Sequence, residues 1–312
     1  MVVAQDAKHE FSIYGGGGVS ALQYTPAQGS SQLGIGGGGG VGYSFFIAPQ
    51  LGFNTGVEAA VFNASVSGAT VTGSSKEVFD FTNPTRTEEA YFQSTYSDYK
   101  ETQRALYLQI PLMAQFQTGA GNQFYAAAGV KVGLMFAGSY ETTADHLVLS
   151  GYFPTTAQTF DDAIEMGYVT KEHPTASDNL DFGTNLALAA EAGIRWRGTV
   201  LPNTTIYTGV YMDYGLLNIA PPKTTSLVHR PTNDLNNFAY NSTLTATLPT
   251  GSSYVDKVNL LSVGVKLRVV LYSHRSDMSK KVKHTLQQEC DYIVAPKKRN
   301  PSSTKRTGIS LQ

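Results

Sequence analysis

Hydrophobic and polar residues alternate with a period of two along most of this chain. Residues 106–116 carry Leu, Leu, Ile, Leu, Ala and Phe at even positions, and Tyr, Gln, Pro, Met and Gln at odd positions. Successive side chains of a β-strand point to opposite faces, so this segment has one apolar face and one mixed face. The same alternation predicts eight strands, at residues 9–22, 32–46, 50–63, 99–117, 123–140, 183–197, 204–217 and 258–272.

These segments and their connections have the proportions of membrane strands. A soluble strand has about 5–6 residues, whereas a tilted membrane strand needs about 9–11 residues within the hydrocarbon. Short links (48–49, 118–122, 198–203) alternate with longer ones (23–31, 64–98, 141–182, 218–257). Outer-membrane barrels sort their loops in this way. We therefore predict an all-β fold, an eight-stranded antiparallel up-and-down transmembrane β-barrel with mobile outer loops.

Aromatic residues fall near both ends of the predicted strands, as in the two girdles of a membrane barrel. The predicted periplasmic girdle contains Tyr43, Phe45, Phe53, Phe116, Phe124, Trp196, Tyr207 and Tyr272. The predicted outer girdle contains Tyr24, Phe62, Phe136, Tyr140 and Tyr214.

The mixed face of the strands carries ionisable residues that should point into the barrel. This predicted lumen network contains Glu58, Lys131, Glu191, Arg195, Asp213, Lys266 and Arg268. The interior of an eight-stranded barrel is only wide enough for side chains, and a buried charge without a partner is costly. A salt-bridged plug is the favoured interpretation, and a gated ion path is the alternative.

Composition agrees with this reading and divides the chain into three parts. Charged residues make up 15%, against about 25% in ordinary soluble proteins. Residues 273–312 hold nine Lys/Arg and three Asp/Glu, a net +6, which leaves 14 against 21 in the rest. We predict a signal-peptide remnant at 1–7, the barrel at 8–272 and a basic periplasmic tail at 273–312, with a short helix near 277–288. The alternatives are an ordinary terminus and a soluble extension or cloning remnant.

Three segments resemble the outer-membrane β-barrel domains of Bacteroidetes. They are the strand at 10–18 (EFSIYGGGG), the glycine-rich strand at 34–42 and residues 106–112 (LYLQIPL). These domains are similar to the transmembrane part of OmpA-type proteins. The resemblance covers residues 8–272 and implies a fold and a compartment, not an activity. Many OmpA-type proteins continue into a peptidoglycan-binding domain of over a hundred residues, whereas 40 residues follow the last strand here.

The link at 141–182 is acidic and aromatic, with eight Asp/Glu against Lys171. Its candidate partner-binding residues are Tyr152, Phe153, Asp161 and Asp162. Such a loop can bind a partner, or calcium that bridges to lipopolysaccharide, because aromatic residues are enriched at interfaces. The alternative is that the loop packs on itself over the barrel mouth.

No motif indicates an enzyme, a cofactor or a metal. The glycine runs at 15–18 and 36–40 lack the Lys-Ser/Thr that a phosphate-binding loop requires. The six histidines form no HExxH pattern, and there is no Gly-x-Ser-x-Gly elbow. The single cysteine, Cys290, excludes an internal disulfide.

We therefore predict a non-enzymatic barrel of a Gram-negative outer membrane, with extracellular loops and a periplasmic tail. Its predicted role is structural or partner-binding, as a scaffold or an accessory subunit of an envelope complex. Its predicted partners are outer-membrane lipid, lipopolysaccharide and other outer-membrane proteins, with weak contact of the tail to peptidoglycan and no nucleic acid. A small porin and a soluble lipocalin-like carrier are the alternatives.

Overall fold

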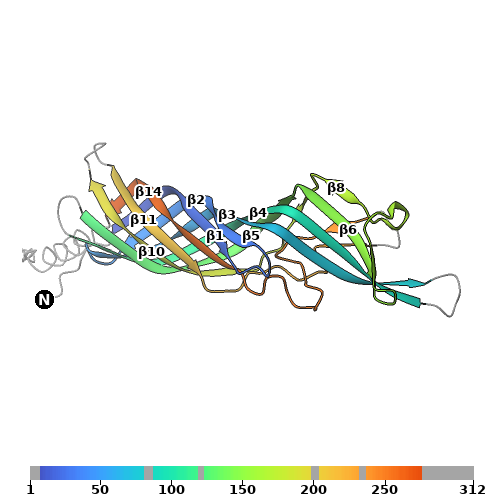
Figure 1. Cartoon of the computed structure of the whole chain (residues 1–312). Helices are drawn as coiled ribbons and strands as arrows, with labels where there is room; N and C mark the ends of the chain where they lie inside the picture. The colour runs from blue at the N-terminus through green and yellow to red at the C-terminus, as the bar shows by residue number, and fades with distance from the viewer. Residues whose placement is uncertain (1–7, 81–86, 119–122, 198–203, 232–236, 276–312) are drawn as a thin grey trace, which may run out of the picture.

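Eight long strands form a closed antiparallel ring. The computed structural model describes residues 8–80, 87–118, 123–197, 204–231 and 237–275. The ring runs β1-β2-β3-β4-β5-β10-β11-β14 and returns to β1, each strand pairing with both neighbours (Figure 1). Its strands are β1 (Lys8–Gln23), β2 (Ser30–Phe46), β3 (Leu51–Asp80), β4 (Thr87–Gln117), β5 (Gln123–Thr143), β10 (Asn185–Arg197), β11 (Thr205–Gly215) and β14 (Asn259–Arg275). All eight lie where the alternation predicts strands.

Shorter elements lie outside the ring. The remaining strands of the described residues are β6 (His146–Phe153), β7 (Gln158–Phe160), β8 (Thr170–Glu172), β9 (Thr175–Asn179), β12 (Val228–His229) and β13 (Ala239–Tyr240). A 3₁₀ turn, η1, covers Ile164–Met166. No helix in the described ranges has the length and apolar character needed to cross a membrane.

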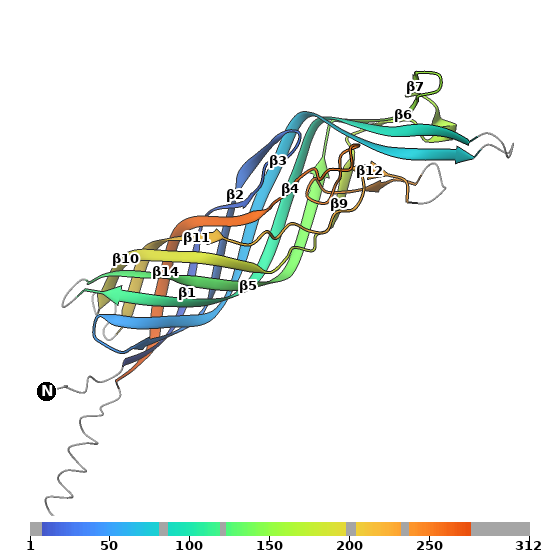
Figure 2. The same ribbon diagram turned by 90° about the horizontal axis from the view of Figure 1, so that it is seen from below.

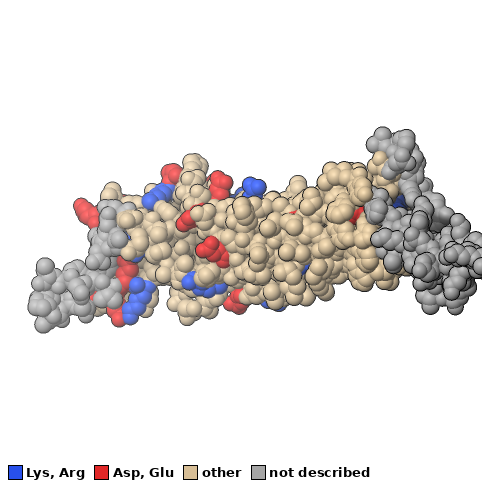
Figure 3. Space-filling view, turned by 180° about the vertical axis from the view of Figure 1, so that it is seen from behind, with Lys and Arg blue, Asp and Glu red and all other residues tan. Residues whose placement is uncertain are grey.

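The outer wall of the ring is apolar and its interior is polar. Leu108, Val132, Leu188 and Val265 point outward and are 46%, 39%, 51% and 66% exposed. Outward positions on β4 from 106 to 116 are all apolar, an 11-residue stretch that matches the length of a membrane crossing. Figure 3 shows the band over the ring almost free of charge on that face, while charged side chains gather over the other end. The predicted orientation of the two faces is confirmed.

The glycine runs make room for large side chains of other strands. β1 and β2 pair glycine with glycine from Gly15↔Gly39 to Gly18↔Gly36. A Cβ on Gly16 would lie 3.3 Å from the Tyr211 ring and 2.7 Å from a β14 carbonyl oxygen. One side of the interior therefore carries almost no side chains, as close packing in a first hairpin requires.

Beyond the ring, the polarity of the two strand faces is reversed, so that apolar residues point inward and polar residues point outward. On β3, Phe62, Ala64 and Val66 are buried, whereas Asn63 and Ser65 face outward. Above a membrane the outer face meets water, so polar residues belong outside and apolar residues inside. β3 and β4 continue paired as far as Asp80↔Thr87, and Figure 2 shows them bending away from the ring axis.

The predicted loop at 64–98 is wrong, because most of this segment forms the hairpin of β3 and β4. β6 adds to the free edge of β4 from Ser97↔His146 to Tyr91↔Tyr152, and β7 and β8 pair with β6. We call this part, β6–β8 with the outer halves of β3 and β4, the outer extension. The predicted loop at 141–182 therefore contains sheet structure.

The third long link, 216–258, packs against the concave side of the outer extension (Figure 2). It has little regular structure, yet eight of its apolar residues are buried: Ile219, Leu227, Val228, Leu244, Ala246, Tyr254, Val255 and Val258. They join Phe92, Tyr96, Tyr99, Leu147 and Leu149 in one core. This link closes over the outer end of the ring, and we call it the cap.

Several girdle assignments are wrong. Tyr24, Phe62 and Tyr140 are buried in the core of the outer extension, because aromatic residues above the ring point inward. Tyr207 is fully buried inside the ring, on the same face as Arg195 and Arg268. Phe53, Phe116, Phe124, Phe136, Tyr214 and Tyr272 are exposed on the wall as predicted.

The predicted terminal segments fall almost entirely outside the described residues. These are the signal-peptide remnant at 1–7, and the tail from 276 onward with its short helix at 277–288. β14 itself extends to Arg275, three residues past the predicted end of the barrel.

Candidate functional site: the ring interior and its cap

Lys131 forms the centre of the interior. Its ammonium nitrogen lies 2.7 Å from Asp213 Oδ2 and 3.1 Å and 3.2 Å from the two carboxylate oxygens of Glu58. The side chains of Lys131, Glu58 and Asp213 are 4%, 9% and 8% exposed. They come from β5, β3 and β11, so this cluster joins three walls of the ring.

A second cluster lies around Glu191 on β10. One carboxylate oxygen accepts a hydrogen bond from the Tyr125 hydroxyl at 2.6 Å, and the other lies 3.0 Å from Lys266 Nζ. The Lys266 ammonium also lies 4.2 Å from the centre of the Tyr14 ring. Each charged group is paired, as burial in a low dielectric requires.

A third cluster lies nearer the chain termini. Glu10 accepts hydrogen bonds from Arg195 at 3.3 Å and from the Tyr207 hydroxyl at 2.9 Å, and it forms an ion pair with Lys8. Arg268 donates to Gln115 Oε1 at 2.7 Å, and its guanidinium lies 3.9 Å from the centre of the Tyr207 ring.

All seven predicted lumen residues face the interior, where the structure gathers them into three neighbouring clusters. The prediction counted three acids and four bases, and Glu10 adds the missing acid. Glu10, Glu58, Glu191 and Asp213 then lie among Lys131, Arg195, Lys266 and Arg268, and Lys8 adds a fifth, less buried base beside Glu10. The alternation of β1 could have indicated Glu10, since it shares a face with Ser12 and Tyr14.

The clusters leave almost no free space. The cavity between Tyr14, Glu58, Lys131, Tyr211 and Lys266 measures about 10 Å³. A cavity needs roughly 10–15 Å³ to hold a single water molecule. The described side chains therefore fill the ring rather than line a continuous pore.

The cap is fixed to the ring through Glu101 on β4, a buried carboxylate that the sequence reading missed. One oxygen accepts from Gln103, Ser242 and Thr243 Oγ1 at 2.6, 2.6 and 3.0 Å. The other accepts from the Tyr99 hydroxyl at 2.5 Å and from the Thr243 backbone N–H at 2.9 Å. Five donors satisfy this group. No sequence motif marks it, because its partners in the cap lie more than 140 positions further along the chain.

Arg230 fixes the cap to the outer extension. It donates to Glu77 at 2.9 Å and to the Met166 carbonyl at 2.5 Å. Its guanidinium packs against the Phe92, Tyr168 and Phe238 rings at 4.6–5.6 Å from their centres. Burial raises the pKa of Glu77, and the charge of Arg230 opposes that shift.

The four candidate residues of the link at 141–182 divide into two groups. Phe153 is 6% exposed and packs edge-on against Phe160, so it is no surface residue, which corrects its assignment. Tyr152 is half-buried, whereas Asp161 and Asp162 are exposed beside Phe160 and Ile164. The link thus packs on itself in part and exposes the rest of its surface, while its predicted binding of a partner or of calcium stays a prediction.

Within the described ranges, no group of three or more His, Cys, Asp or Glu residues is arranged to hold a metal ion.

Comparison with known proteins gives the following. The family model described as outer membrane protein beta-barrel domain matches residues 3–248. No curated protein matches the chain. Two crystal structures of Ail, the attachment invasion locus protein of Yersinia pestis, are similar at 11% sequence identity. They cover 85% of this chain and 99% of Ail, with TM-scores of 0.24 and 0.25, and one contains the heparin analogue sucrose octasulfate.

Proposed function

The chain belongs to the outer membrane protein β-barrel domain family, and from this premise we propose that it is a closed membrane anchor that presents its outer extension to a partner. The family places it in the outer membrane as a transmembrane β-barrel. The predicted family is thus confirmed at this level, while the Bacteroidetes origin and the OmpA-type relationship stay predictions. The soluble lipocalin-like carrier is not favoured.

The observation that carries the proposal is the closure of the interior. Lys131, held between Glu58 and Asp213, crosses the ring at its centre, and the neighbouring cavity measures about 10 Å³. Above it, the cap covers the outer end of the ring and is fixed by Glu101. A hydrated ion needs a continuous aqueous path, and nothing in the described interior favours the small porin. No reaction is part of the proposal.

Planar-bilayer recording tests this closure. The reconstituted protein should show no unitary conductance under conditions in which a general porin, recorded in parallel, opens steadily. Steady wild-type channels that disappear in Lys131→Ala or Glu191→Ala would overturn the proposal, because the charged residues would then line a path rather than block it.

We infer the orientation of the barrel in the membrane from the lengths of the links at the two ends of the ring. Short links connect the strands at one end, and the outer extension and the cap lie at the other. We place the outer extension outside the cell and the tail in the periplasm, as the loop asymmetry of outer-membrane barrels implies.

The surface that we propose for partner binding is the turn at η1. Ile164 is 68% and Phe160 43% exposed, and Asp161, Asp162 and Glu165 are exposed beside them. Backbone hydrogen bonds between Ala163 and Tyr168 close the turn. A rigid apolar tip with an acidic rim suits a basic protein surface that has an apolar pocket.

A pull-down from native membranes in mild detergent tests the partner-binding role. The wild type should retain a partner that the Phe160→Ser/Ile164→Ser variant loses. The control is Ile47→Ser, which removes an apolar residue of similar exposure, 46%, from the short link between β2 and β3 at the other end of the ring. Equal recovery with all three proteins would contradict the role of this turn.

A further inference from the structure

A recess opens in the outer rim of the ring where β1 ends. β1 and β2 pair only as far as Ser20↔Gly34, but β1 continues along β14 to Gln23↔Asn259 and β2 continues along β3 to Ser30↔Ser67. Beyond Ser20, β1 thus stays beside β14 while β2 stays beside β3, and the two strands separate. The link after β1 turns inward, since Ala27 N–H donates to the Tyr254 carbonyl of the cap.

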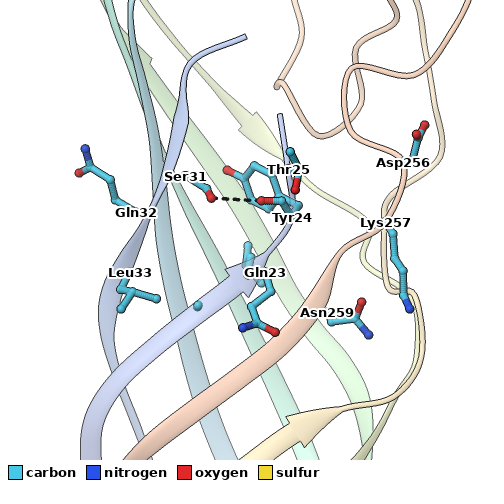
Figure 4. A pocket seen from close by; sticks show the side chains of 11 residues that line it. Gln23, Tyr24, Thr25, Ser31, Gln32, Leu33, Asp256, Lys257 and Asn259 are labelled. Carbon is cyan, nitrogen blue, oxygen red and sulfur yellow. Dashed lines mark hydrogen bonds between the residues drawn. The ribbon is translucent and has the colours of Figure 1, made fainter. Parts of the chain in front are cut away.

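The recess has a volume of about 600 Å³. Figure 4 shows Gln32 and Leu33 on one side, and Asp256, Lys257 and Asn259 on the other. The end of β1, with Gln23, Tyr24 and Thr25, lies between them. The only hydrogen bond drawn across it joins the Ser31 hydroxyl to the Tyr24 carbonyl, at 3.1 Å.

The recess lies at the upper limit of the lipid-facing wall. Val19 and Val263, which pair across β1 and β14, are 48% and 45% exposed just below it. A register shift in β2 between Leu33 and Gly37 leaves Leu33 and Ile35 65% and 81% exposed. Within a few residues, the apolar surface of the wall therefore gives way to amide and charged side chains.

These groups fit one kind of ligand. The amide of Gln23 can donate to and accept from sugar hydroxyls, whereas the Gln32 amide is turned toward β3 and donates to the Ser67 hydroxyl at 3.0 Å. Lys257 is exposed at the edge, forms no ion pair with any described residue, and can bind a phosphate through a charge-assisted hydrogen bond. Asp256 supplies acceptors for further hydroxyls. Leu33 and Ile35 continue the surface on which acyl chains would lie.

We propose that this recess binds the phosphorylated sugar headgroup of an outer-leaflet glycolipid, with its acyl chains along Leu33 and Ile35. The inference rests on the proposed orientation, because only then does the recess face the outer leaflet. It turns the predicted contact with lipopolysaccharide into a defined site on β1, β2 and the segment before β14.

Lipid retention on extraction tests the site. The protein is reconstituted into vesicles of phosphatidylethanolamine that contain a minor fraction of a bis-phosphorylated diglucosamine glycolipid, then extracted in mild detergent. Bound lipid is counted by native mass spectrometry. The wild type should carry one glycolipid and be enriched at least about tenfold over phosphatidylethanolamine, as one good charge-assisted contact provides.

Two variants address the recess itself. Lys257→Gln removes the cation and should reduce glycolipid retention about tenfold. Ser31→Trp, at the residue whose hydroxyl reaches across the recess to Tyr24, should block the recess and abolish retention. Lys76→Gln is the matched control, since it removes an exposed lysine from the distant hairpin, and it should retain glycolipid like the wild type. All variants are first checked for folding by gel mobility with and without heating.

The outcomes separate this inference from the proposed function. Retention that is equal in wild type, Lys257→Gln and Ser31→Trp overturns the site, even if the protein is closed to ions. Equal loss in Lys76→Gln overturns it as well, because the effect would then be general surface charge. If soluble glucosamine phosphate displaces the lipid, the headgroup is recognised alone; if phosphatidylethanolamine binds as well as the glycolipid, the sugar is not recognised and the inference fails.

Discussion

Replacing Lys131 by Met tests whether the interior charges are paired as the structure describes. Methionine keeps the length of the side chain but removes the ammonium group that lies 2.7 Å from Asp213 and 3.1 Å from Glu58. Two buried carboxylates then face each other without a cation. Breaking a buried ion pair by removing one partner costs about 3–5 kcal/mol. The folding equilibrium should therefore fall by about two to three and a half orders of magnitude.

Equilibrium unfolding in urea from lipid vesicles measures this cost. Trp196 is the single tryptophan and donates to Thr208 Oγ1 at 2.9 Å, so its fluorescence reports the folded state. The control is Lys76→Met, the same substitution at a pair whose side chains are 50% and 57% exposed. An exposed pair contributes about 0–1 kcal/mol. If both substitutions cost the same, the reasoning about buried pairing is refuted.

A rescue variant separates charge from packing. Lys131→Met combined with Glu58→Gln and Asp213→Asn has no net charge in this cluster and nearly the same volume. It should recover more than half of the lost stability, because a neutral cluster avoids burying unpaired charge. A triple variant no more stable than Lys131→Met would mean that lost packing, not charge, explains the effect.

Three further predictions concern the wall and the cap. Val265→Arg places a charge near the middle of the lipid-facing wall and should cost about 2–4 kcal/mol in the same unfolding assay, whereas Thr70→Arg on the exposed outer half of β3 should stay within about 0.5 kcal/mol; equal costs would contradict the assigned faces. Glu101→Gln replaces one accepting carboxylate oxygen by an amide NH2 that faces donors such as Tyr99 and Thr243, costs about 1–3 kcal/mol, and should speed proteolysis within the cap at least about fivefold, while the exposed Glu172→Gln should not. Burial lowers the pKa of His229 below 6.5, so the cap is most stable above that pH and loses stability as the pH falls through it toward the lowered pKa. The protection factors for hydrogen exchange at β12 and β13, which are corrected for the intrinsic exchange rate at each pH, should therefore fall from about pH 7.5 to about pH 5.5, and a fall of the same size in His229→Gln would rule out this residue as the cause.

The lipid-facing half of the fold could be predicted from the sequence because lipid imposes a strict rule there. Every outward position of β4 from 106 to 116 must be apolar, and Lys131, Glu191 and Lys266 on the other face must then point inward. Above the membrane, β3 keeps its alternation but with Phe62 and Val66 inward and serines outward. A prediction that expects apolar residues on the outer face therefore assigns a loop to that segment.

The contacts of the cap could not be predicted from the sequence, for a different reason. Glu101 meets Ser242 and Thr243, and Arg230 meets Glu77, across more than 140 residues. Neither local periodicity nor a motif connects such positions. Glu10, in contrast, lay within the pattern of β1 and could have been included by extending the face of Ser12 and Tyr14 by one step.

Paramagnetic relaxation of methyl groups tests the central claim most directly and needs no substitution. The labelled wild type is placed in lipid nanodiscs that contain either a nitroxide in the acyl chains or a water-soluble gadolinium chelate. The account predicts that the acyl-chain nitroxide broadens the methyl signals of Leu108, Val132, Leu188 and Val265, and that neither probe reaches Leu147, Leu149 and Leu244 in the core beneath the cap. Four wall methyls shielded from the lipid nitroxide, or cap methyls broadened by gadolinium, would contradict an apolar wall around a closed interior.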